Sequence, residues 1–139
     1  MTIKSFQTLV KDEINTLASL REGGALGLIE DDLALVDKIR AQLLSGVAVV
    51  VTTPALTRDG IPSAGISAGG ELVIQCLEQR AHLRNKPGAI TAIDAAEAIM
   101  FKLDGFMLLH FKDIKSSVDR DTGILTVSVT FSFSVILGQ

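Results

Sequence analysis

A serine framed by glycines is the first candidate for chemistry in this sequence. Gly65-Ile66-Ser67-Ala68-Gly69 satisfies G-x-S-x-G, the turn that exposes a nucleophilic serine between a strand and a helix in one class of hydrolases. Asp94 and His110 follow Ser67 in the chain order that this class uses for its acid and base. The residues after Ser67 are typical of a strand, however, and the chain is short for that fold. We therefore favour a small-residue turn, with a serine hydrolase as the weaker alternative.

A thiol or metal site is the second candidate. Cys76 with His82 or His110 would supply a nucleophile and its base. Cys76, however, shares a predicted strand face with Leu72 and Ile74, where a free cysteine usually packs as a small apolar side chain. One cysteine and two histidines offer no ligand pair at zinc-site spacing, and the glycines fit neither a P-loop nor a dinucleotide fingerprint. We predict no catalytic, cofactor-binding or metal-binding residue, and therefore no enzyme.

Composition and charge narrow the class of partner. The 139 residues suffice for one domain with a real core, and 47% of them are hydrophobic. A net charge of -3 and a pI near 5.3 lack the basic excess that nucleic-acid binding requires. The lone cysteine excludes an intrachain disulfide, which makes the cytoplasm the default compartment. Mean hydropathy is +0.41, but no apolar run approaches the roughly 20 residues of a membrane span. We therefore assign the apolar residues to a core or to protein interfaces.

Apolar residues at spacings of three and four predict two helices in the first third of the chain. One stripe covers residues 3–20 and ends at Gly23-Gly24, and a second covers residues 31–45 behind an acidic start. The residues between the two helices are interpreted as a short connector. We expect residues 1–24 to form an N-terminal helix at the periphery of a single domain that spans residues 1–139.

Strand signals dominate the rest of the chain. β-branched residues on both faces of 47–53 predict a central strand, and 71–77 predicts another extended run. Thr91 is expected to cap a helix over 92–104 that is apolar on several faces and so covered on more than one of them. Two strands, about 107–118 and 123–137, are joined by a predicted hairpin loop. The predicted fold class is α+β, with a mostly antiparallel sheet of about four to five strands packed against helices and a C-terminal β-hairpin.

The last predicted strand has the clearest pattern in the sequence. From Leu125 to Leu137 apolar residues alternate with serine and threonine, so one face is apolar and the other is hydroxylic and uncharged. Fifteen extended residues span roughly 50 Å, whereas a domain of this size is about 35 to 40 Å across. An overhanging end would expose unpaired backbone groups and attract a strand from a neighbouring subunit. Twist or a bulge that keeps the strand inside one sheet is the alternative.

The order of elements resembles a known family. From Val73 the chain runs through a strand, Glu78-Gln79-Arg80, a loop with Asn85-Lys86-Pro87-Gly88, a Thr-capped Ala-rich helix ending before Gly105-Phe106, and a terminal hairpin. Over about 65 residues, 73–137, this resembles the tail terminator and minor tail (tail completion) proteins of long-tailed bacteriophages and prophages, including the Mu-like group. The resemblance implies a structural, non-enzymatic protein of the α+β class.

The resemblance also implies partners and a location. Proteins of this family assemble as a ring, commonly a hexamer, that caps the tail tube and joins tail to head. The implied partners are further copies of the chain, the tail tube and head-completion proteins, with no membrane and no specific nucleic acid. The implied location is the host bacterial cytoplasm during assembly and then the virion tail. A small bacterial ligand-binding or regulatory α+β domain is the alternative function.

Candidate interface residues follow from loop positions and from the last strand. The loops 54–62 and 80–88 are the predicted contacts with neighbours or tube, although ordinary solvated loops explain them as well. The overhanging part of the last strand adds two aromatic residues. The complete set of predicted interface residues is Leu56, Arg58, Arg80, Arg84, Lys86, Phe131 and Phe133.

Overall fold

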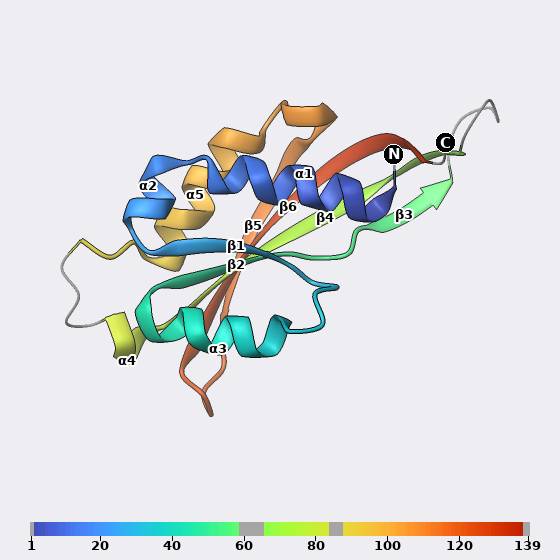
Figure 1. Ribbon diagram of the computed structural model, residues 1–139. Helices are drawn as coiled ribbons and strands as arrows, with labels where there is room; N and C mark the ends of the chain where they lie inside the picture. The colour runs from blue at the N-terminus through green and yellow to red at the C-terminus, as the bar shows by residue number, and fades with distance from the viewer. Residues whose placement is uncertain (1, 59–65, 84–87, 138–139) are drawn as a thin grey trace.

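The computed structural model describes residues 2–58, 66–83 and 88–137, and in this part the chain forms one twisted sheet with helices on both faces (Figure 1). The strand order is β1-β2-β4-β6-β5, with β3 on the same side of β4 as β2. All pairs are antiparallel except β1 with β2. This confirms the predicted α+β class, and the sheet has six strands: β1 (Ala25–Ile29), β2 (Val47–Val51), β3 (Ala55–Arg58), β4 (Ile66–Gln79), β5 (His110–Val118) and β6 (Ile124–Leu137).

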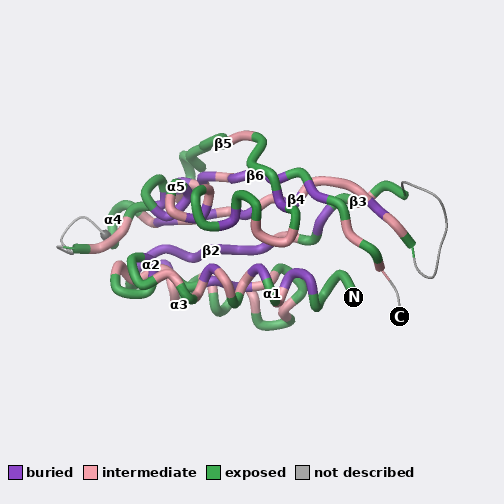
Figure 2. Tube along the Cα trace, turned by 90° about the horizontal axis from the view of Figure 1, so that it is seen from above, coloured by how far each residue is buried: buried purple, intermediate pink, exposed green. Residues whose placement is uncertain are grey.

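The centre of the sheet is formed by β2, β4 and β6. Every residue of β2 is buried, as its β-branched residues on both faces predict, and Figure 2 shows it buried along its whole length. β4 and β6 pair without interruption from Ile66 opposite Leu137 to Gln79 opposite Ile124. β5 continues the sheet through the predicted hairpin, where Gly123 turns the chain with a φ of 74°. The long final strand therefore lies within one sheet along its entire length.

One face of the sheet, here called the inner face, carries the main core. Helices α1 (Ile3–Asn15), α2 (Ala18–Glu22) and α5 (Ala92–Leu103) supply side chains to the same apolar cluster as this face. Thr2 caps α1 by accepting a hydrogen bond from the Ser5 N–H at 3.1 Å. Thr91 caps α5 by accepting one from the Asp94 N–H at 3.2 Å, as predicted. Phe6, Val10 and Ile14 of α1 are buried in this cluster, so the helix that we expected at the periphery is built into the core.

The opposite, outer face is covered over part of its width. Helix α3 (Leu35–Ser45) packs on β1 and β2 through a small cluster of Leu28, Leu43 and Ala48, on the other side of the sheet from α1 (Figure 1). Beyond α3 the outer face displays the serine and threonine side chains of β6 that alternate with its buried residues. The alternation thus predicted the two faces of β6 correctly.

Two strands differ from the sequence analysis. The predicted connector between the first two helices contains β1, whose five residues with a central glycine give little periodic signal. β3 lies directly after Pro54 and forms because β4 offers a long partner strand. The first predicted helix divides at Thr16-Leu17, and the predicted loop after Gln79 begins with the short helix α4 (Arg80–Leu83). A 3-10 turn, η1 (Phe106–Leu108), replaces the first residues of the predicted strand 107–118.

Candidate functional site

The serine of the G-x-S-x-G pattern lies inside a strand. Ser67 is the second residue of β4 and pairs with Ile136, so its side chain faces the outer side of the sheet. Asp94 lies on α5, which covers the inner face, and is separated from Ser67 by the sheet. A nucleophile elbow needs a helix directly after the serine, and β4 continues instead for twelve residues to Gln79. The structure therefore does not bring the three hydrolase candidates together.

The thiol candidate is buried in the main core. Cys76 faces the inner side next to Ile74, on the same strand face as Leu72, and is fully covered. Burial raises the pKa of its thiol to about 12, because an apolar surrounding disfavours the thiolate. His82 contacts the Leu43 carbonyl oxygen through Nδ1 at 2.9 Å, and His110 lies at the exposed start of β5. Among the described residues no three His, Cys, Asp or Glu side chains gather as a metal site would require.

The predicted interface residues separate into three groups. Leu56 and Arg58 lie on β3, where Arg58 is exposed and Leu56 is partly buried against the core. Arg80 is exposed at the start of α4, whereas Arg84 and Lys86 lie outside the described residues. Phe131 and Phe133 are buried within the subunit itself. Their apolar strand face is thus covered by the chain's own helices, and the exposed face of β6 carries serine and threonine side chains together with Ile136.

A three-stranded extension of the sheet, here called the distal arm, carries the first two of these residues. It consists of β3, residues 66–71 of β4 and residues 132–137 of β6. β5 begins at His110, opposite Ser132, and β2 ends at Val51. Neither strand extends along the distal arm, so the sheet has only three strands here. Figure 1 shows β3 and the adjoining ends of β4 and β6 reaching away from the helices.

An apolar groove of 540 Å³ lies beside the distal arm. It is bounded by Met107 and Leu108 on one side and by Ser134, Val135 and Ile136 on the other, with Phe6 and Ser67 completing the lining. Met107 and Leu108 have φ angles of 49° and 63°, in the left-handed region that side chains with a Cβ rarely adopt. Each such residue costs about 1–3 kcal/mol, and such costs concentrate at functional surfaces. In this corner of the chain, formed by Met107 and Leu108, the Leu108 residue has 64% of its surface exposed.

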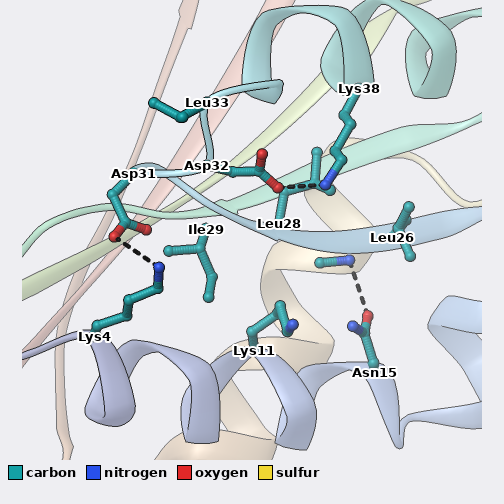
Figure 3. A pocket seen from close by; sticks show the side chains of 11 residues that line it. Lys4, Lys11, Asn15, Leu26, Leu28, Ile29, Asp31, Asp32, Leu33 and Lys38 are labelled. Atoms are coloured by element: carbon teal, nitrogen blue, oxygen red, sulfur yellow. Dashed lines mark hydrogen bonds and ion pairs between the residues drawn. The ribbon is translucent and has the colours of Figure 1, made fainter.

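A second groove, of 670 Å³, follows the outer edge of β1 between α1 and the start of α3 (Figure 3). Asn15 closes part of the edge, because its Oδ1 accepts a hydrogen bond from the Gly27 N–H at 2.9 Å. Lys4 pairs with Asp31 at 3.8 Å and Lys38 with Asp32, as the dashed lines in Figure 3 mark. Hydrogen bonds from Lys38 and from the Ala34 N–H hold the pKa of Asp32 below its usual value. The charges of this groove are therefore largely balanced within the protein.

Helix α5 exposes two large apolar side chains among the charged residues of its uncovered side. Its buried side chains, Ala92, Ala95, Ala96, Ile99 and Leu103, lie on one side. Ile93 and Phe101 project elsewhere, and Phe101 is 73% exposed. The prediction that this helix is covered on more than one face is therefore wrong for the subunit, which buries one side of it. Large exposed apolar side chains at such a surface are typical of protein-binding sites.

The sequence analysis missed the Met107-Leu108 corner and Ile136. An apolar run, Phe106 to Leu109, is visible in the sequence, but nothing in its pattern predicts two consecutive left-handed residues.

No described helix is long and apolar enough to cross a membrane.

Comparison with known proteins gives a fold relationship. No family model and no curated protein matches the sequence. The structure is similar to a chain from the virion of a native gene transfer agent particle, with a TM-score of 0.64, 17% identity and 94% coverage of both chains. A structure from Akkermansia muciniphila, solved without its transmembrane region, was also found, with 15% identity over 100% of this chain and 88% of the other. Its TM-score of 0.33 is too low to show a shared fold. The first similarity shows that the two chains share a fold.

Proposed function

We propose that the chain is a structural subunit of a phage-like particle, and that within the particle it is the tail terminator, a ring that caps the tail tube and joins tail to head. The observation that carries the proposal is the similarity to a chain of the gene transfer agent virion, which extends over 94% of both chains. Because it covers 94% of this chain, the similarity extends well beyond the roughly 65 residues that resemble tail terminators in sequence order.

The surface of the subunit supports assembly rather than isolated action. A ring is built from head-to-tail contacts, in which each copy uses two different patches. The subunit exposes apolar side chains at separate places: Phe101 and Ile93 on α5, Leu108 and Ile136 at the distal arm, and Leu33 beside β1. Neighbouring exposed apolar side chains can form protein-binding sites. This distribution is what a subunit with two unlike contacts requires.

The partner class follows from the charge and the location of these patches. The net charge of -3 and the paired charges around β1 give no basic stripe for nucleic-acid phosphates. The exposed patches are apolar, which suits further copies of the chain, the tail tube and head-completion proteins. In this proposal the protein assembles in the bacterial cytoplasm and ends in the virion tail.

A small-molecule-binding domain is the second candidate, because the groove beside β1 has the volume of a ligand site. A ligand there would stabilise the fold in proportion to its concentration, so a thermal-shift screen of small metabolites with the purified protein tests it. A concentration-dependent rise of the melting temperature that Leu26→Lys, at an exposed residue of the groove lining, abolishes would support this candidate. No shift across the screen would leave the structural role as the better account.

Binding to tail tubes tests the main proposal. Purified protein is mixed with isolated tail tubes that lack their terminator and examined by sedimentation and negative-stain electron microscopy. The proposal expects density at one end of each tube and an end to further tube growth. Density along the tube wall, or none on any tube, would contradict it.

A further inference from the structure

Both sides of the distal arm end in a strand edge without a neighbouring strand among the described residues. On one side the outer edge of β3 is open over Ala55–Arg58, because β1 stops at Ile29 and the chain turns away into α3. On the other side the edge of β6 is open over 133–137, because β5 begins only at His110, opposite Ser132. Open edges present backbone N–H and C=O groups to any strand that can reach them.

The two edges match each other. They are four and five residues long, and their residues stand in the same rows of the sheet, with Thr57, Gly69 and Ser134 in one row and Arg58, Ala68 and Val135 in the next. Because they lie on opposite sides of the same three strands, the β3 edge of one copy can meet the β6 edge of the next without using either edge twice. This is the arrangement that a head-to-tail ring needs.

We propose that a second copy of this chain occupies the open β6 edge, and that it does so with its β3, which extends the sheet from subunit to subunit. This inference rests on the proposed ring and names the contact that closes it. β3 and β6 both run antiparallel to β4, and so run parallel to each other. Rotation about an axis along the strands preserves their direction, so β3 pairs in parallel with β6 of its neighbour.

Apolar side chains flank this joint on both faces. Leu108, held by the left-handed corner, stands beside the β6 edge, and Ile136 is 59% exposed on the outer face of the same edge. The groove of 540 Å³ lies between them and has room for side chains of an added strand. Its mainly apolar lining favours the uncharged residues Ala55–Thr57 of an added β3 over a charged peptide. β-Strand addition of this kind uses the backbone for affinity and such side-chain sites for specificity.

Cysteine cross-linking tests the joint. The variant Thr57→Cys/Ser134→Cys places one thiol on each edge, on the outer face, while the native Cys76 is buried. Within one subunit the two positions are separated by β4, and two strand spacings of about 4.8 Å exceed the reach of a disulfide. Every disulfide formed by these two positions therefore joins two copies.

The expected result is a ladder of covalent multimers on denaturing gels of the assembled protein. Thr57→Cys/Ser117→Cys is the matched control, since Ser117 is an equally exposed serine on β5, away from the open part of β6. Rings that give no ladder with Ser134→Cys, or give one with the control, would overturn the joint and leave the ring intact. A protein that remains monomeric under all conditions, with and without tail tubes, would overturn the ring as well.

A surface substitution provides an independent readout. Ile136→Lys puts a charge on the proposed joint without disturbing the core, and we expect it to raise the concentration needed for assembly at least tenfold. Val36→Lys, at a residue of α3 with a similar exposed fraction of 62%, is the control and is expected to assemble as the parent does. Equal effects of the two substitutions, in variants with unchanged circular dichroism, would contradict the proposed location.

Discussion

The phenyl rings of Phe6 and Phe133 stack with their centroids 4.8 Å apart and their planes at 24°. This contact packs α1 against β6, at the point where the sheet narrows to the distal arm. It accounts for two differences from the sequence analysis at once. The N-terminal helix belongs to the core, and a strand residue predicted at an interface is covered from within the subunit.

Phe133→Ala is expected to lower the free energy of unfolding by about 3–5 kcal/mol, because it removes a buried aromatic ring and leaves a cavity beside Phe6. Urea denaturation followed by circular dichroism measures the change. Phe101→Ala is the control, since its ring is largely exposed and its loss should change stability by about 0.5 kcal/mol or less. Equal stability losses in the two variants would show that the assignment of Phe133 to the core is wrong.

Glu78→Ala should destabilise the subunit by about 1–3 kcal/mol. The buried carboxylate accepts a hydrogen bond from the Ala92 N–H at 3.1 Å, in the first turn of α5, and without it that donor is buried unpaired. Glu78→Gln keeps an oxygen in the same place and should recover much of the loss. Chemical denaturation of both variants checks this, and a glutamine variant no better than alanine would refute the hydrogen-bond explanation.

Cys76 should make stability fall at high pH. Its pKa is raised by burial from about 9 in the unfolded chain to about 12, so the fold favours the thiol form. The contribution is complete below pH 9 and is lost as the pH rises toward 12, by at most about 1.4 kcal/mol per pH unit. The measurement is the difference in unfolding free energy between the parent and Cys76→Val at pH 8 and pH 10.5. A difference that is the same at both pH values would contradict the burial.

Leu108→Gly should separate folding from assembly. Glycine adopts the left-handed conformation without steric cost, so the variant subunit should be as stable as the parent or more stable by about 1 kcal/mol. Leu108→Ala keeps the steric cost and should gain nothing. Both variants lack the exposed side chain beside the β6 edge and should assemble more weakly than the parent, as measured by light scattering across a dilution series. Unchanged assembly in both would remove Leu108 from the contact.

The sequence predicted those elements whose period and length left one interpretation. The buried β-branched run of β2, the alternation of β6, the turn at Gly123 and the cap at Thr91 each depend on local chemistry, and each is confirmed. The strand β1 depends instead on pairing with β2, whose partner residues follow 22 positions later in the chain, so its own five residues carry too little signal.

The candidate surface was harder to predict for a physical reason. Alternation shows that one face of β6 is apolar but not whether a helix of the same chain or a second copy covers it. Phe131 and Phe133 illustrate the limit, because α1 and α5 already cover them. Arg58 and Leu56 lie at an open edge because β1 ends before it reaches them, and that is a property of topology rather than of local pattern.

Native mass spectrometry of the protein released from terminated tail tubes tests the central claim most directly. The account predicts one closed species with an integer number of subunits of 14.8 kDa, six for the expected hexamer, and no larger open polymers. Subunits recovered only as monomers, or as a continuous series of lengths, would contradict a ring.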